Sequence, residues 1–465
     1  MPISKDFSKY KEDYIDLDDF FDGERRVKEK GDRYTPKLEG HIDKPTLYAQ
    51  YKAFGILYNV LHRTRQGLKG AIVRKPLDID FPEGKKELLD DIMITGASFN
   101  DLSREVCDDV IGYGRCGALV DIYEDTQLPY VAFYKTMSIL DWPKSKKDKQ
   151  EITLQEMIEE TNSDDELVEI EQRRKLELDG AGRYCVSVYR KASDTDDTWV
   201  LHEGPIYPKY KGKTLDYIPF VFFGSSNNTP EPSRPPLLDL LSLSKGHWKL
   251  TVAYQYALNL TGLPTPCFAG FEFEEGAVTP LGSGASYHTA DAQAKSWFLQ
   301  TGGSGLAEME HGLDRIEKQM AVVGARLLEE QKSGVEAAET IKVRSSGDSA
   351  TLADIAGNIE NGLTKVLKYV GALVGITEKV RCGVNKDFVS ARLSPQDITA
   401  LLAAVQSGNM SVETFLWNLQ QGETLQPGRS IEEEQEAIAE DKIKQQREAP
   451  ALQFGAIGSQ TLPGT

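Results

Sequence analysis

Apolar side chains recur every three to four positions along one long segment in the middle of the chain, residues 235–262. One stripe consists of Leu237, Leu241, Ser244, Trp248, Val252, Tyr256 and Leu260, and a second of Leu240, Leu243, His247, Leu250, Tyr254 and Leu258. This spacing predicts a helix about 38 Å long, which the prolines at 235 and 236 begin and Gly262 with Pro264 ends. A helix with two apolar faces is buried or lies between neighbours. It is therefore either a core helix of one large domain or a strut in a ring of identical subunits.

The same periodicity predicts further helices on both sides of this segment. They cover residues 45–68, 98–112, 305–330, 352–374, 394–406, 411–421 and 430–448. Residues 331–350 are rich in small and polar side chains, which is typical of a mobile loop. Residues 1–44 are polar with little periodicity, so we expect an arm that is partly ordered at best, and residues 449–465 read as a flexible tail.

Alternating or β-branched runs predict strands, and together with the helices they indicate an α+β fold. The runs lie at residues 71–82, 118–123, 129–142, 183–191, 198–202 and 218–223. A basic turn at residues 144–149 precedes an acidic stretch at residues 156–171. Such neighbouring charges predict a solvated hairpin and helix, with a partner-binding surface as the alternative. Residues 263–300 hold short strand-like pieces and glycine turns, which predicts a compact insert at the far end of two helices.

Composition narrows the class of protein. Of the 465 residues, 40% are hydrophobic and 27% are charged, with a net charge of −18, so the chain as a whole repels duplex DNA. The sequence contains neither a long apolar run nor a charged-then-apolar leader, and we expect no membrane span and no signal peptide. The five cysteines are scattered and odd in number, which favours a reducing compartment and argues against a zinc site.

The candidate chemistry is sparse. Residues 112–117 spell G-x-G-x-x-G, but a predicted helix precedes the glycines and a strand follows them. A dinucleotide site requires the reverse order, so we interpret these glycines as a helix C-cap and turn. The six histidines are dispersed, and we find no nucleophile motif, metal-ligand motif or phosphate loop. We therefore expect no catalysis, no cofactor and no metal; an uncharacterised enzyme that uses the glycine turn is the alternative.

Three blocks of sequence resemble portal proteins of tailed bacteriophages, in particular a subfamily known as a phage domain of unknown function. The blocks are YKAFGILYNVLHRTRQGLKGAIVRKP, ITGASFNDLSREVCDDVIGYGRCGALVDIY and YIPFVFFGSSNN followed by PPLLDLLSLSKGHWKLTVAYQYALNLTGLPTPCFAG. The resemblance spans roughly residues 45–375, and the order and spacing of the blocks carry it. It implies a portal fold with an α/β wing, a stem of two helices, a small β-containing clip and a helical crown.

The resemblance also implies a division of the chain. After the arm at 1–44, the expected parts are a wing (45–234), a first stem helix (235–262), a clip (263–304), a second stem helix (305–330), a tunnel loop (331–350), the long wing helix with its return (351–393), a crown (394–448) and the tail (449–465). On this reading Leu241, Trp248, Val252 and Tyr256 lie in the stem between subunits. Lys332, Lys342 and Arg344 of the tunnel loop face DNA, unless Lys342 and Arg344 pair with Glu336, Glu339 or acids of neighbouring subunits.

The implied function is a ring, typically of twelve subunits, at one capsid vertex of the virion, assembled in the host cytoplasm. Double-stranded DNA passes through it without sequence-specific contacts. The implied partners are the large terminase subunit, head-completion (adaptor) and tail proteins, and the major capsid and scaffold proteins. ATP hydrolysis belongs to the terminase. Another ring-forming head–tail connector is the second interpretation.

Overall fold

The computed structural model describes residues 3–123, 125–145, 147–161, 165–193, 196–210, 212–263, 265–273, 286–299, 303–328, 338–386, 388, 395–421 and 431–448. The chain divides into two compact units, Met1–Lys386 and Asp387–Thr465. Helices and antiparallel sheets both contribute to the first unit, and the predicted α+β class is confirmed.

The first residues of the chain belong to its core, so the prediction of a partly ordered arm is wrong. Three helices follow one another there: α1 (Lys5–Lys9), α2 (Lys11–Asp22) and α3 (Glu24–Glu29). Tyr14, Leu17 and Phe20 recur at helical spacing on α2 and are all buried. The acidic residues between them make the segment polar on average without interrupting this stripe.

The helix predicted over residues 45–68 is two helices, α4 (Pro45–Ala53) and α5 (Val60–Ile72). The helix is interrupted at Gly55. The Trp248 indole lies so close to this residue that a Cβ atom on it would come within 2.3 Å of the ring. Asn59 then caps α5, because its side-chain oxygen accepts a 3.0 Å hydrogen bond from the backbone N–H of His62. The interruption depends on the contact between Gly55 and Trp248. Helical periodicity reports only local spacing and therefore does not predict it.

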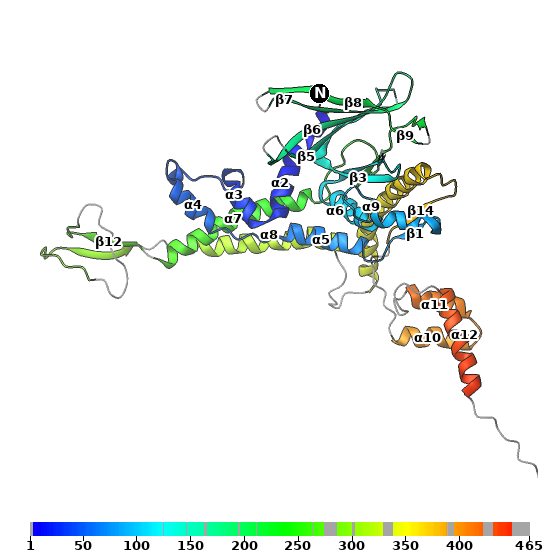
Figure 1. Ribbon diagram of the computed structural model, residues 1–465. Coiled ribbons are helices and arrows are strands. Elements are labelled where there is room, and N and C mark those ends of the chain that lie inside the picture. The colour runs from blue at the N-terminus through cyan, green and yellow to red at the C-terminus, as the bar shows by residue number, and fades with distance from the viewer. Residues whose placement is uncertain are drawn as a thin grey trace, which may run out of the picture. The chain divides into compact units, whose positions relative to one another are not determined.

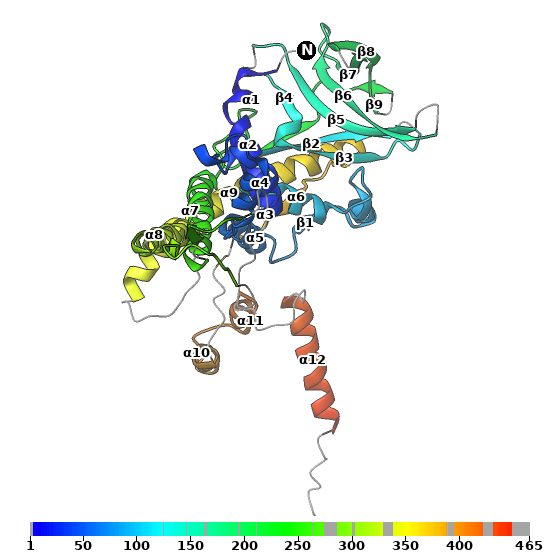
Figure 2. The same ribbon diagram turned by 90° about the vertical axis from the view of Figure 1, so that its left-hand side faces the viewer.

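Two antiparallel sheets pack face to face above the helices (Figures 1 and 2). The smaller sheet has the order β11–β2–β3 and the larger one the order β4–β5–β6–β7–β8. The strands are β2 (Arg115–Ile122), β3 (Pro129–Lys135), β4 (Ile139–Asp141), β5 (Glu151–Thr161), β6 (Leu167–Leu178), β7 (Tyr184–Ser193), β8 (Asp196–Ile206) and β11 (Phe220–Gly224). Helices α6 (Phe99–Tyr113) and α9 (Ala338–Leu373) contact the smaller sheet. The shared core includes Leu119, Tyr134, Leu154, Leu176 and Phe220.

The acidic stretch at residues 156–171 lies in the β5–β6 hairpin, so the predicted hairpin is present and the predicted helix is not. Its carboxylates pair with cations on neighbouring strands. Glu156 lies 2.7 Å from Arg174, and Glu171 lies 2.7 Å from Lys191. Alternate residues of one strand point to the same face, so strands can place unlike charges opposite each other. Glu156, Glu160 and Glu171 are thus paired with cations of the sheet.

Short elements connect these layers. The remaining strands of the first unit are β1 (Asp78–Asp80), β9 (Lys209–Tyr210), β10 (Lys213–Thr214), β12 (Thr265–Ala269), β13 (Lys295–Leu299) and β14 (Arg381–Gly383), and the 3-10 turns are η1 (Gly31–Arg33), η2 (Glu39–His41), η3 (Glu83–Asp91) and η4 (Thr136–Ser138). β1 pairs with β14, which joins the segment after α5 to the segment after α9.

Two long helices, α7 (Leu238–Gly262) and α8 (Ser304–Leu328), lie side by side and run in opposite directions (Figure 1). Both agree with the predicted helices to within a few residues. The second unit contains α10 (Pro395–Gln406), α11 (Val412–Gln421) and α12 (Ile431–Glu448), in keeping with the three predicted helices. Successive helices of this unit contact each other, and Leu416 is buried there.

Candidate functional site

The part of the molecule that bears on function is the pair α7 and α8 with the hairpin between them. The first two-thirds of α7 are enclosed within the chain, since α2, α4, α5 and α8 all contact this helix. Members of both predicted apolar stripes are buried there, including Leu240 and Leu241. In the second stripe Leu240 and His247 are buried, whereas Leu243, Leu250 and Tyr254 are partly buried. The chain's own helices therefore cover this stripe in part.

Trp248 is the largest fully buried side chain on α7. Its indole N–H donates a 2.9 Å hydrogen bond to the hydroxyl of Thr35, and its ring lies against the backbone of Gly55. Two segments far apart in the sequence thus meet on this one residue. The contact fixes the N-terminal region and the α4–α5 break against α7.

Polar contacts connect α7 to its neighbours as well. His247 is buried, and its Nε2 lies 3.1 Å from the carboxylate of Glu317 on α8. Its Nδ1 lies 3.3 Å from the Thr251 hydroxyl. On the other side, Lys245 donates to the carboxylate of Asp16 on α2, which also accepts a 2.6 Å hydrogen bond from Arg33. These contacts hold α7 to α8 and to the N-terminal helices.

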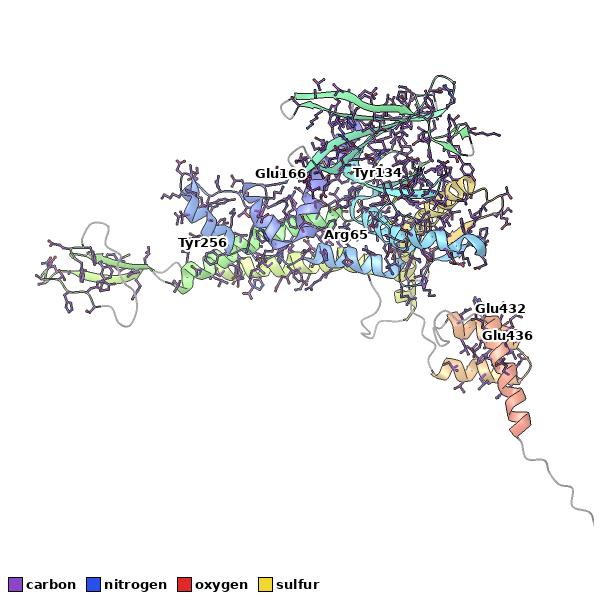
Figure 3. The ribbon with its side chains drawn as sticks, viewed as in Figure 1. Arg65, Tyr134, Glu166, Tyr256, Glu432 and Glu436 are labelled. Carbon is purple, nitrogen blue, oxygen red and sulfur yellow. The ribbon has the colours of Figure 1, made fainter. Side chains whose placement is uncertain are left out.

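The residues predicted to lie in the stem between subunits face the interior of this chain, which corrects that interpretation. Leu241, Trp248 and Val252 are buried within the subunit. Tyr256, labelled on α7 in Figure 3, packs edge-on against Tyr51, with 5.1 Å between the ring centroids. Periodicity identifies an apolar stripe but does not say which helix covers it, and here α2, α4 and α5 do.

The end of α7 is different, because its apolar side chains are exposed. Leu258, Leu260 and Leu263 all face solvent, and Leu263 is 69% exposed. Beyond them the β12–β13 hairpin projects away from the rest of the first unit (Figure 1). Apolar side chains gathered at such a projecting end mark an interaction surface.

The hairpin has exposed side chains on both faces, with Trp297 and Leu299 on one face of β13 and Phe298 on the other. In its register Cys267 lies opposite Trp297, and Thr265 opposite Leu299. On the other face, Phe268 packs against a cluster of aromatic rings, Phe271, Phe273 and Tyr287. Every residue of β13 is exposed, Trp297 and Leu299 among them. We name Leu258, Leu260, Leu263, Trp297, Phe298 and Leu299 the distal apolar surface.

The predicted tunnel loop is shorter than the sequence suggests. Helix α9 begins at Ala338, so Lys342 and Arg344 lie in its first turns and that half of the predicted loop is helical. Lys332 lies outside the described residues. The helix continues because Ala338 to Arg344 contains no glycine or proline, and the propensity of alanine, glutamate, lysine and arginine favours it.

The glycine-rich turn has the structure predicted for a cap. Helix α6 precedes it, β2 follows it, and Gly114 adopts φ +80 at the end of α6. A Cβ atom at Gly114 would lie 2.9 Å from the carbonyl oxygen of Ser233, so the space next to this glycine is filled by chain. Among the described residues, no group of three or more His, Cys, Asp or Glu side chains is arranged to hold a metal ion. Within the same residues, no helix combines the length and hydropathy needed to cross a bilayer.

Comparison with known proteins gives matches of two kinds. Residues 236–372, from α7 into α9, match the model of a domain of unknown function, DUF4055. No curated protein matches the chain.

Solved structures similar to the chain come from gene transfer agent particles. One is from the virion of the native particle, with 10% identity and a TM-score of 0.42, covering 79% of this chain and 90% of that one. Two others, with the same identity and coverage, are from the neck of the empty particle computed with C6 symmetry (TM-score 0.41) and the neck of the native particle computed with C12 symmetry (TM-score 0.39).

Proposed function

We propose that this chain is the subunit of a portal ring of a tailed bacteriophage, through which DNA is packaged into the capsid and later ejected. The observation that carries the proposal is the stem, two long antiparallel helices, α7 and α8. One apolar stripe of α7 is buried in the subunit near the sheets, and the apolar side chains at the far end of α7 are exposed. The order of elements along the chain, from wing to helix, hairpin, returning helix and long helix, is the order that the sequence resemblance implies.

The distal apolar surface supports assembly into a ring. A two-stranded hairpin is marginally stable alone, and Phe298 of this one is 63% exposed. Packing against neighbouring copies would remove its side chains from water. Contacts between different surfaces of identical subunits close into a ring when the rotation between copies closes. The neighbouring subunit contacts then lie at the hairpin end, and the buried stripe of α7 contributes to the fold of each subunit.

The charge of the chain suits a channel. A net charge of −18 keeps a sliding duplex from binding tightly, since tight binding to phosphates requires a basic surface. We assign to the chain passage of DNA without sequence specificity and no catalysis. The packaging motor, and later the head-completion and tail proteins, would dock at the hairpin end, and the motor would supply the energy.

Mass photometry and negative-stain imaging of the purified chain test this proposal. We expect closed rings at micromolar concentration.

The double variant Leu263→Asp with Phe298→Asp should reduce ring formation, because it places charges on the distal apolar surface where a neighbour would desolvate them. The matched control is Leu201→Asp, since Leu201 is a similarly exposed leucine on β8. The thermal melt of the double variant, measured by circular dichroism, separates loss of assembly from loss of folding. A wild-type chain that stays monomeric in several salt conditions, or a folded double variant that still forms rings, contradicts the proposal.

A further inference from the structure

A cluster of charged side chains joins three helices at the corner between the wing and the stem. Arg65, labelled on α5 in Figure 3, projects between α2 and α6. Its guanidinium lies over the ring of Phe21 on α2, 4.2 Å from the centroid, and 5.1 Å from the ring centroid of Tyr113 on α6. It also lies 2.7 Å from the carboxylate of Asp108. A single arginine thus contacts both flanking helices.

Two further carboxyl groups lie at this junction. The Tyr113 hydroxyl donates to the carboxylate of Asp18 on α2, which connects α2 to α6 directly. Asp109 is buried, and its nearer oxygen lies 3.7 Å from Arg65, beyond hydrogen-bonding distance. Its other oxygen has no hydrogen-bond partner among the described residues. A buried carboxylate with an oxygen that lacks a hydrogen bond is more costly in its charged form than in its protonated form.

Acidic side chains around Asp109 outnumber the basic ones. The charged and titratable groups that face it or its partners are Arg65 and Lys69 from α5, Asp18 and Asp22 from α2, Glu105, Asp108 and Tyr113 from α6, Cys116 from β2 and Lys135 from β3. Burial raises the pKa of Asp109 to about 7, against the opposing effect of Arg65 and Lys135. Burial also raises the pKa of Asp18, partly offset by the hydrogen bond from Tyr113.

We propose that this junction is a proton-sensitive clasp, which holds α2 on α5 and α6 more tightly in mildly acidic than in mildly alkaline solution. When Asp109 loses its proton, its charge is buried with one oxygen that lacks a hydrogen bond, and it repels Asp18 across the α2–α6 contact. When it is protonated, both penalties disappear, and Arg65 remains paired with Asp108. The clasp is a property of the single chain and is independent of the portal role.

The direction of the pH effect follows from proton linkage. Asp109 has a pKa of about 7 in the folded chain against an ordinary value of 3.8. Above pH 7 the carboxylate is charged in both states, and its burial destabilises the folded one. As the pH falls below 7, the folded state takes up a proton that the unfolded state does not yet bind, so its relative stability rises. Asp18 and Glu105, whose pKa values are also raised by burial, act in the same direction.

The test compares melting temperatures of the full chain between pH 6 and pH 8.5 at constant ionic strength. The wild type should melt several degrees lower at pH 8.5. Asp109→Asn, which is neutral throughout, should lose most of this decrease and melt above the wild type at pH 8.5. The control is Asp314→Asn, an exposed aspartate on α8, which should keep the wild-type pH dependence.

Hydrogen exchange provides a readout that a purely structural role would not change. After correction for the intrinsic rate, the α2 amides of the wild type should exchange several-fold faster at pH 8.5 than at pH 6, and those of Asp109→Asn should not. The proposal is wrong if Asp109→Asn retains the wild-type pH dependence of melting. It is equally wrong if exchange in α2 is the same at both pH values in the wild type.

Discussion

At the scale of single residues, two glycines lie where the neighbouring parts of the chain leave no space for a Cβ atom. Trp248 fills the space next to Gly55, and Ser233 fills the space next to Gly114. Gly55 belongs to no motif with a known function, whereas Gly114 belongs to the G-x-G-x-x-G spelling. The G-x-G-x-x-G spelling at residues 112–117 indicates a cofactor only if the surrounding elements are ignored, whereas the cap geometry of Gly114 explains it.

Gly55→Ala should destabilise the chain, because the new Cβ would lie 2.3 Å from the Trp248 ring. Such overpacking typically costs about 1–3 kcal/mol. The free energy of unfolding can be measured by urea titration followed by tryptophan fluorescence.

The matched control is Gly70→Ala on α5, where a Cβ meets nothing within 4 Å. Alanine in an exposed helical position should be neutral or stabilise the chain by about 0.5–1 kcal/mol. Equal stabilities of the two variants would show that the indole does not constrain Gly55.

At the scale of elements, the N-terminal helices pack against α7 and hold it in place. Helix α2 contacts α5, α6 and α7, and its buried side chains Tyr14, Leu17 and Phe20 contribute to the same core. Asp16 and Asp19 are buried too, and a carboxylate oxygen of each lies within hydrogen-bonding distance of the Tyr34 hydroxyl, which donates its one proton to either of them. The helices of this region therefore stabilise the subunit before any neighbour is present.

Deletion of residues 1–34 should prevent cooperative folding of the chain, because it uncovers the α7 face that carries Trp248 and removes the α2 core residues. The soluble fraction after expression and the circular dichroism melt measure this effect.

The control for the deletion is Arg25→Ala. Arg25 pairs only with Glu29 on the surface of α3, with 93% of its side chain exposed, and such a pair contributes at most about 0.5 kcal/mol. A truncated chain that is soluble and melts like the wild type would support the prediction that the N-terminal residues form a partly ordered arm.

At the scale of the whole molecule, exposed apolar side chains concentrate where the proposed ring contacts lie, at the end of α7 and on β13. DNA passage requires weak contacts, and the cations at the start of α9 are the candidates that the sequence offers. Their helical setting gives them a defined spacing along α9.

The double variant Lys342→Ala with Arg344→Ala should leave ring formation intact and reduce the amount of DNA packaged or retained. The contact is to phosphates alone, so it should be independent of sequence and weaken as salt rises. Packaged-DNA length and phage titre measure the effect.

The control for this variant is Lys379→Ala, which removes a cation after α9 in the same unit. Normal DNA length and normal titre from the double variant would remove Lys342 and Arg344 from the mechanism.

The sequence by itself determined the elements whose signals are local. The stripes of α7 and α8, the Ser98 cap of α6 and the glycine that ends α6 depend on residues a few positions apart, and all of them are present in the structure. The helical periodicity of these segments specifies an apolar face. It does not specify what covers that face.

The tertiary structure alone decided the partners of those faces. The stripe through Trp248 is covered by the chain's own N-terminal helices, and Leu258 and Leu260, the exposed leucines of α7, lie at its far end. The break at Gly55 and the cluster around Arg65 and Asp109 likewise join residues from distant segments. Burial, close approach and a raised pKa arise from the summed surroundings of a side chain, and those surroundings exist only once the chain has folded.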